Sequence, residues 1–287
     1  MKRYTHIIYL LGLLFFTPLL HAQVAPVIEW QKCLGGSGAD LGYGMQQTAD
    51  HGYVMVGEIS SDNGDVSGFH GYYDYWVIKV DSVGNLQWQN SLGGTKYDDG
   101  IAIQQASDGG YIVAGGSYSN DGDVTGHHGQ EDYWVVKLDA EGNIVWEKSL
   151  GGDNYDKAFA VCQTTDGGFM VAGVSNSNSG DVTGNHGDGD FWVVKLDSVG
   201  TLMWQKSLGG SDDDDAYAVQ PTSDNGCIVA GYSSSNDGDV SGNHGGYDYW
   251  VVKLDALGNT TWKKCTTSWR IRFCHCITRT SMYGVKS

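Results

Sequence analysis

The feature that most constrains this chain is an internal repeat with a period of about 58 residues. The segment 119–146, SNDGDVTGHHGQEDYWVVKLDAEGNIVW, recurs one period earlier, one period later and two periods later. No insertion or deletion separates the members of one tryptophan column: Trp30, Trp88, Trp146, Trp204 and Trp262. So strict a period predicts one supersecondary unit per copy, with the copies at about 31–88, 89–146, 147–204 and 205–262 inside a domain spanning 23–265.

Each copy is expected to form four short β-strands. In the second copy they fall at 100–106, 111–116, 132–139 and 144–150, separated by Gly- and Asp-rich turn sequences. The runs YIVAGG and YWVVKL are almost continuously apolar, which is typical of strands that are covered on both faces. The sequence therefore predicts an all-β fold, a β-propeller or an open propeller-like array of four-stranded antiparallel blades.

Tryptophan occupies a second column, in the third strand of every copy: Trp76, Trp134, Trp192 and Trp250. A buried indole removes about 150–250 Å² from water, which suits the gap between two neighbouring blades. We expect both tryptophan columns to be architectural, and stacking on a sugar is the alternative.

The two ends of the chain differ from the repeats. A basic start, an apolar run at 7–20 and the small residue Ala22 predict a secretory signal peptide over 1–22, too short to span a bilayer. We therefore expect an exported protein, secreted or on the outer cell surface, with no membrane insertion after cleavage. After Cys265 the repeat gives way to an aberrant basic tail, 266–287, for which we expect low order. A frameshift or truncation would explain it, and a genuine basic tail is the alternative.

One further segment resembles a fourth strand without the rest of its copy. Residues 27–34 precede the four complete copies and predict a lone strand. Closure of a ring through this strand would compete with the strand that carries Trp262. Since four blades are the lower limit for a propeller, an open arc is one of the two expected forms.

Charge and cysteine usage exclude some partners and cross-links. The chain has 17 basic and 34 acidic residues and a net charge of −17, which argues against a nucleic-acid partner. Of the six cysteines, Cys162 and Cys227 have no counterpart in the other copies, so no copy depends on a disulfide. Cys33 and Cys265 share a column, and a bond between them would require the two ends of the array to meet.

The residue pattern resembles two groups of repeat proteins. A glycine pair closing the second strand, an apolar third strand and a tryptophan in the fourth resemble the kelch order, although the Tyr-Asp-Pro turn of that family is absent. The unit DGGYIVAG…DYWVVKLDxxGNxxW is more similar to secreted tandem repeats of bacteria that use the type IX secretion route, which are sometimes compared with bulb-type lectins. This resemblance covers residues 30–264 and implies a surface β-propeller-like array without implying a chemistry.

Acidic residues in the long loop are candidate calcium ligands. Each copy places an aspartate after a glycine, and hard cations such as Ca²⁺ prefer such oxygen ligands. The loop lacks the ligand order of an EF-hand, and aspartates also form Asx-turns with their own backbone. The candidates, with turn formation as the alternative, are Asp65, Asp123, Asp181 and Asp239.

Two more columns in the loop are candidate binding residues. The histidines are His70, His128, His186 and His244, and the aspartates before the third strand are Asp74, Asp132, Asp190 and Asp248. One histidine per copy cannot complete a zinc site, so each is expected to bond the loop backbone. The aspartates are expected to bond backbone N–H groups at the start of the strand.

No catalytic arrangement is recognisable in the sequence. Repeated carboxylates fit poorly with one acid and one base in different environments, and no nucleophile elbow, phosphate loop or zinc-protease motif occurs. The sequence therefore predicts a non-enzymatic protein that binds a protein or glycan ligand through its loops and has no cofactor apart from the calcium candidate. A carbohydrate-active protein, either a lectin-like binder or a polysaccharide hydrolase, is the alternative.

Overall fold

The computed structural model describes residues 27–266 of the chain. The predicted signal peptide lies outside the described residues, as does the predicted basic tail apart from Thr266. The chain divides into two units, Met1–Gln31 and Lys32–Ser287, and every described strand belongs to the second.

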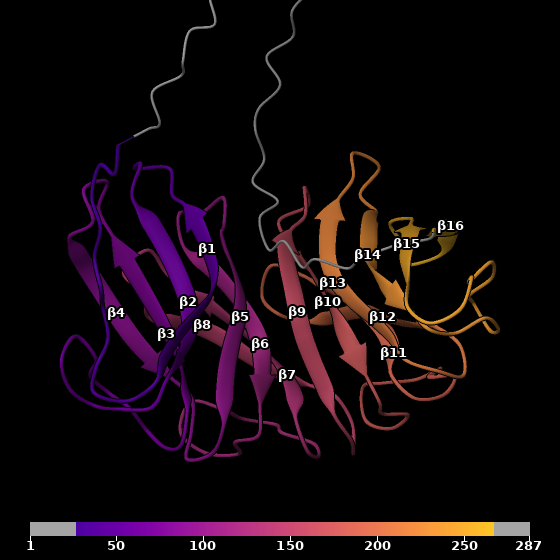
Figure 1. The fold of residues 1–287 in the computed structure, drawn as a ribbon, viewed down its shortest axis with the longest axis horizontal. Helices are drawn as coiled ribbons and strands as arrows, with labels where there is room; N and C mark the ends of the chain where they lie inside the picture. Colours follow the sequence, from indigo (N-terminus) through magenta and orange to yellow (C-terminus); the bar gives the residue numbers. More distant parts are fainter. Residues whose placement is uncertain (1–26, 267–287) are drawn as a thin grey trace, which may run out of the picture. The chain divides into compact units, whose positions relative to one another are not determined.

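The described residues form sixteen strands and no helix, and therefore no helix that could cross a membrane. They build four antiparallel sheets of four strands, each in the order of the sequence, and the row of sheets is not closed into a barrel (Figure 1). This confirms the predicted all-β array. The sheets are β1 (Asp40–Gln47), β2 (Tyr53–Ile59), β3 (Asp74–Val80) and β4 (Leu86–Leu92); β5 (Asp98–Gln105), β6 (Tyr111–Ser117), β7 (Asp132–Leu138) and β8 (Ile144–Leu150); β9 (Asp156–Gln163), β10 (Phe169–Ser175), β11 (Asp190–Leu196) and β12 (Leu202–Leu208); β13 (Asp214–Pro221), β14 (Cys227–Ser233), β15 (Asp248–Leu254) and β16 (Thr260–Thr266).

The lone strand predicted at 27–34 is wrong. The described residues before Asp40 form no strand, although their sequence matches that of β4, β8, β12 and β16. The fourth strand of every sheet pairs only with the third strand of its own copy. Residues 27–34 pair with none of the described strands, so they do not form a fifth fourth-strand.

Tight turns set the order of the strands. Between β5 and β6, the N–H group of Ala106 donates to the carbonyl oxygen of Gly110 at 2.8 Å. Between β7 and β8, Oδ1 of Asp139 accepts from the backbone N–H groups of Glu141 at 3.0 Å and Asn143 at 2.8 Å, which is an Asx-turn. Because these turns recur in every copy, the same meander forms four times.

Neighbouring sheets pack face to face through one repeated aromatic contact. Tyr75 of the first sheet lies with its ring centroid 4.7 Å from that of Trp134 in the second, and its hydroxyl donates to the carbonyl oxygen of Trp134 at 3.0 Å. The pair Tyr133 and Trp192 repeats the contact with a centroid separation of 4.5 Å. The third-strand tryptophans therefore fill the gaps between sheets, as predicted, and Trp134 and Trp192 are fully buried.

The fourth-strand tryptophans cover a turn of the following copy. Trp88 lies under Gly142, where a side-chain carbon would come within 2.9 Å of the indole and φ is +88°, a conformation that favours glycine. Trp146 lies under Gly200 and Trp204 under Gly258 in the same way. Trp262 has no following copy in the described chain, and it is 48% exposed.

The four described cysteines are all free. Cys162 and Cys227 are buried in one apolar cluster of the third and fourth sheets, and burial raises the pKa of each thiol to about 12. Cys33 and Cys265 are not bonded to each other.

Candidate functional site

The structure joins the predicted histidine and aspartate columns into one pair per copy. In each pair the aspartate is buried, and its Oδ2 accepts both the backbone N–H of the histidine four residues earlier and a bond from the ring Nδ1. The Nδ1–Oδ2 distances are 2.9, 3.0, 2.7 and 2.8 Å for His70–Asp74, His128–Asp132, His186–Asp190 and His244–Asp248. The prediction that each histidine ring bonds the loop backbone is therefore wrong, because the ring Nδ1 bonds the buried aspartate instead.

Burial changes the acidity of these aspartates. It raises the pKa of Asp74 and of Asp190 to about 6, against the opposing effect of the histidine bonds, and it also raises the pKa of Asp132. The outer ring nitrogens of His128 and His186 lie 3.9 and 4.0 Å from the carboxylates of Asp181 and Asp239 in the next copy. Each of these two histidines therefore lies between two carboxylates from different copies.

The calcium candidates bond the connection between copies. The N–H of Asp123 donates to the carbonyl oxygen of Gly93 at 2.9 Å, and its Oδ2 accepts the N–H of Gly93 at 3.2 Å. Asp65 makes the same reciprocal pair with Gly35, and Asp181 with Gly151. Within residues 27–266 no group of three or more His, Cys, Asp or Glu side chains is placed to hold a metal ion.

Replacing Asp190 with asparagine is expected to change how stability depends on pH. The pKa of Asp190 is about 6 in the folded chain against 3.8 for an ordinary aspartate, so the folded state binds the extra proton between these values. The resulting stabilisation is present below about pH 3.8 and is lost as the pH rises through 6. In denaturant unfolding, the free energy of unfolding of Asp190→Asn, measured relative to that of the parent, should rise by about 1–3 kcal/mol from pH 4.5 to pH 7.5.

Asp166 provides the control of opposite sign. Its bonds to Lys195, Thr164 and Gly168 outweigh the effect of burial and lower its pKa to about 2. Asp166→Asn should therefore lose stability relative to the parent as the pH rises through 3.8. If both variants follow the pH in the same direction, the explanation given for Asp190 is wrong.

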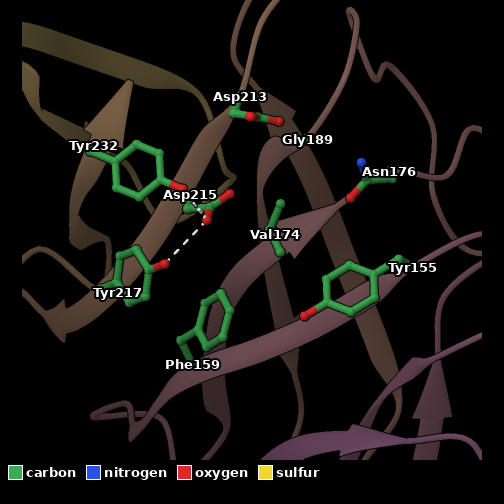
Figure 2. A pocket seen from close by; sticks show the side chains of 9 residues that line it. All are labelled: Tyr155, Phe159, Val174, Asn176, Gly189, Asp213, Asp215, Tyr217 and Tyr232. Carbon is green, nitrogen blue, oxygen red and sulfur yellow. Dashed lines mark hydrogen bonds between the residues drawn. The ribbon is translucent and has the colours of Figure 1, made fainter. Parts of the chain in front are cut away.

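A different set of positions forms a hollow with an aromatic lining. It measures about 310 Å³ and lies between the third and fourth sheets. Figure 2 shows the side chains that line it: Tyr155, Phe159, Val174, Asn176, Gly189, Asp213, Asp215, Tyr217 and Tyr232. We call this hollow the aromatic pocket.

Asp215 is the central polar group of the aromatic pocket. Its Oδ2 accepts hydrogen bonds from the hydroxyl of Tyr232 at 2.6 Å and from the hydroxyl of Tyr217 at 3.2 Å (Figure 2). The ring of Tyr217 is stacked on Phe159, with centroids 4.8 Å apart and planes 17° apart. Burial raises the pKa of Asp215, and it raises that of Tyr217 to about 12. The pocket thus combines flat apolar rings with hydrogen-bonding oxygens.

The pocket lacks the carboxylate that occupies the equivalent place in the second sheet. Gly189 occupies the column that holds Glu131 in the second sheet, and Val174 occupies the column of Gly116. In the second sheet the carboxylate of Glu131 lies directly over Gly116 and fills the equivalent space. In the third sheet Gly189 has no side chain in this place, and Val174 lies against it on the wall of the pocket.

In the second and third sheets the same columns hold a buried ion cluster. Lys157 Nζ pairs with Asp99 Oδ2 and lies 3.2 Å from Glu131 Oε1. Burial raises the pKa of Asp99 and of Glu131, while Lys157 acts in the opposite direction. Burial lowers the pKa of Lys157, but the two carboxylates together raise it. In the first sheet, Glu58 accepts from the hydroxyls of Tyr43 at 3.1 Å and Tyr97 at 2.6 Å.

Two of the predicted loop residues line a second hollow of about 530 Å³ at the junction of the first and second sheets. His70 and Asp123 lie on its wall together with Gln89 and Asn90. The structure therefore brings the histidine of one copy near the aspartate of the next, but it leaves the other predicted residues at separate junctions.

Sequence reasoning missed the aromatic pocket because it followed the columns that stay constant. The pocket is built from columns that vary among four otherwise similar copies. The column of Tyr217 holds tyrosine, isoleucine and phenylalanine in the first, second and third copies, and that of Asp215 holds leucine, aspartate and lysine. Variation between copies in one strand was the available signal.

Comparisons with known proteins do not assign the chain to a family. No protein-family model matches the chain. Over 170 residues the chain is 29% identical to the regulatory protein FlaEY of Caulobacter vibrioides, a match that covers 53% of this chain but only 17% of that protein. A crystal structure of a protein of unknown function from Bacteroides caccae is similar with a TM-score of 0.42 and 11% identity, covering 78% of this chain and 67% of that one.

Proposed function

We propose that this chain is an exported binding protein without a catalytic centre, and that the aromatic pocket takes a sugar unit of a glycan. The observation that carries the proposal is the pairing of the stacked rings of Phe159 and Tyr217 with the carboxylate of Asp215 in one open hollow. A sugar ring offers an apolar face to aromatic rings and hydroxyl groups to carboxylate and amide oxygens. The two requirements are met within the same nine residues.

Charge and the repeat pattern support the same proposal. With a net charge of −17, an uncharged polyol is a better ligand than a nucleic acid or another polyanion. The pattern at 1–22 and the similarity to secreted type IX repeat proteins support export to the cell surface, where glycans are abundant. A rigid row of sheets also holds the pocket open before the ligand binds, which reduces the entropy lost on binding.

The experiment is a glycan array followed by calorimetry on the sugar that binds. Tyr217→Ala removes a stacking ring and Asp215→Asn removes a charged acceptor, and each should weaken binding about 10- to 100-fold. Tyr43→Ala is the matched control, because Tyr43 has the same column in the first sheet and does not line the pocket. Equal effects of Tyr43→Ala and Tyr217→Ala, or no bound glycan, would contradict the proposal.

A second candidate function is polysaccharide hydrolysis. It is favoured by two carboxyl groups, Asp213 and Asp215, on the wall of one pocket, since glycosidases use such a pair. Incubation of the protein with the glycan that binds distinguishes the two functions. Release of reducing sugar that is lost in Asp215→Asn would establish the hydrolase, and binding without release supports the binding protein.

A further inference from the structure

The last sheet exposes the face that every earlier sheet buries. We call it the trailing face and define it by Ile228, Ala230, Tyr249, Val251 and Trp262. The residues in the column of Tyr249 are Tyr75, Tyr133 and Phe191, and each of these is 0% exposed, whereas Tyr249 is 39% exposed. Trp262, at 48%, is exposed for the same reason. The trailing face therefore carries the residues of an internal junction without the sheet that covers them.

The first sheet exposes the opposite half of the same junction. We call it the leading face and define it by Leu41, Tyr43, Met45, Met55 and Trp76. Met45 is 59% exposed, while the residues in its column, Ile103, Val161 and Val219, are exposed by only 9%, 9% and 6%. Leu41 is 48% exposed in the same strand. Both faces are apolar, and no other sheet of the described chain covers either of them, although Leu34 packs beside Trp76, which is 7% exposed.

The internal junctions show how one face recognises the other. At each junction an aromatic ring of the trailing type packs on the third-strand tryptophan of the next sheet, at 4.7, 4.5 and 4.7 Å between centroids. Two side-chain bonds accompany this contact at the first two junctions. The N–H of Gln105 donates to Gln46 at 2.5 Å and that of Gln163 to Gln104 at 2.6 Å. In the opposite direction across the first junction, the side-chain Oε1 of Gln105 accepts a hydrogen bond from the backbone N–H of Ala49 at 2.8 Å.

The two ends of the chain retain the groups that these contacts use. Tyr249 occupies the column of Tyr75, and Trp76 that of Trp134. Gln220 occupies the column of Gln46, and Gln47 that of Gln105. Leu34 packs beside Trp76 in the same way as Leu92 packs in the cluster of Trp134. Leu34 therefore already occupies the place that the column of Thr266 would take, and β16 of an incoming chain would contact the leading face through its residues up to Cys265.

We propose that the trailing face of one copy of this chain docks on the leading face of a second copy and continues the row of sheets from chain to chain. The contact is heterologous, so it generates a ring if the rotation closes and a filament if it does not. Two copies closed in a ring would contain eight sheets, which is within the range of known propellers. The expected contacts are Tyr249 on Trp76, and Gln220 with the N–H of Gln47.

The first measurement is the mass of the full chain by sedimentation as a function of concentration. The parent should assemble into dimers or longer species at ~10 µM, and Tyr249→Arg should weaken assembly at least ~100-fold because a charge would be buried in an apolar contact. Met203→Arg is the control: Met203 is 60% exposed but lies on a middle sheet, away from both faces. It should leave assembly unchanged, and far-UV circular dichroism checks that each variant is folded.

A mixing experiment decides the direction of the contact. Met45→Arg blocks the leading face and Tyr249→Arg blocks the trailing face, so each variant alone should be monomeric. Mixed together they retain one intact pair of faces and should form one-to-one dimers that grow no further. A parent that stays monomeric at ~100 µM would overturn the proposal, with residues 267–287 then the remaining candidate to cover the trailing face. A mixture that stays monomeric while the parent assembles would also overturn it, because the trailing face would then not dock on the leading face. A single variant that still forms dimers would overturn it as well, because the contact would then join like faces.

Discussion

Trp192→Ala is expected to lower the free energy of unfolding by about 3–5 kcal/mol. Trp192 is 0% exposed and lies in an apolar cluster that the second and third sheets share. Its ring packs against Tyr133 and its carbonyl oxygen accepts the Tyr133 hydroxyl, so the side chain fills the gap on which this junction depends. Alanine would leave a cavity larger than the surrounding β-branched side chains can fill.

The measurement is denaturant unfolding followed by circular dichroism, with Trp262→Ala as the internal control. Trp262 is the same residue type in the same chain, but it is 48% exposed and has no following sheet within the described residues. At a concentration where the chain is monomeric, its removal should cost less than about 1 kcal/mol. Similar losses for Trp192→Ala and Trp262→Ala would mean that the sheets do not share a core.

Lys157→Met is expected to destabilise the protein by about 3–5 kcal/mol near neutral pH. Lys157 lies between two carboxylates, those of Asp99 and Glu131, whose side chains are only 4% and 2% exposed. Without the ammonium group both acids would be buried without a counterion. Burial already raises the pKa of each acid in the folded state, and the loss of Lys157 removes the group that opposes this rise.

The sign of the pH dependence provides the test for Lys157→Met. Because the folded pKa of each carboxyl lies above its unfolded value, lowering the pH protonates the acids in the folded chain and restores stability. The loss should therefore shrink from pH 8 to pH 5. In the double variant Lys157→Met with Asp99→Leu, which places in this column the leucine found as Leu41 in the first copy, the part of the loss that comes from Asp99 should be recovered, while the part that comes from Glu131 remains. A loss that is constant with pH would show that Lys157 acts through packing alone.

The histidine–aspartate pairs and the variable columns that form the pocket could both have been predicted from the sequence. Histidine and aspartate four residues apart recur in every copy, and that spacing allows the aspartate to accept both the backbone N–H and the ring Nδ1 of the histidine. The variable columns of β1, β5, β9 and β13 were equally visible.

The repeat, the number of strands per copy and the coverage of the inner sheets on both faces follow from the amino-acid sequence alone. These follow from a strict period, from turn residues at fixed positions and from strands without a polar face, all of which are local properties of the chain. Only the tertiary packing shows that Phe159, Asp215 and Tyr217 line one pocket. The same holds for the position of Lys157 between Asp99 and Glu131. These side chains come from different copies, and only the packing of one sheet on the next brings them within contact distance. The same packing decides that Tyr249 is exposed while its three counterparts are buried, because burial depends on the neighbouring sheet and not on the residue.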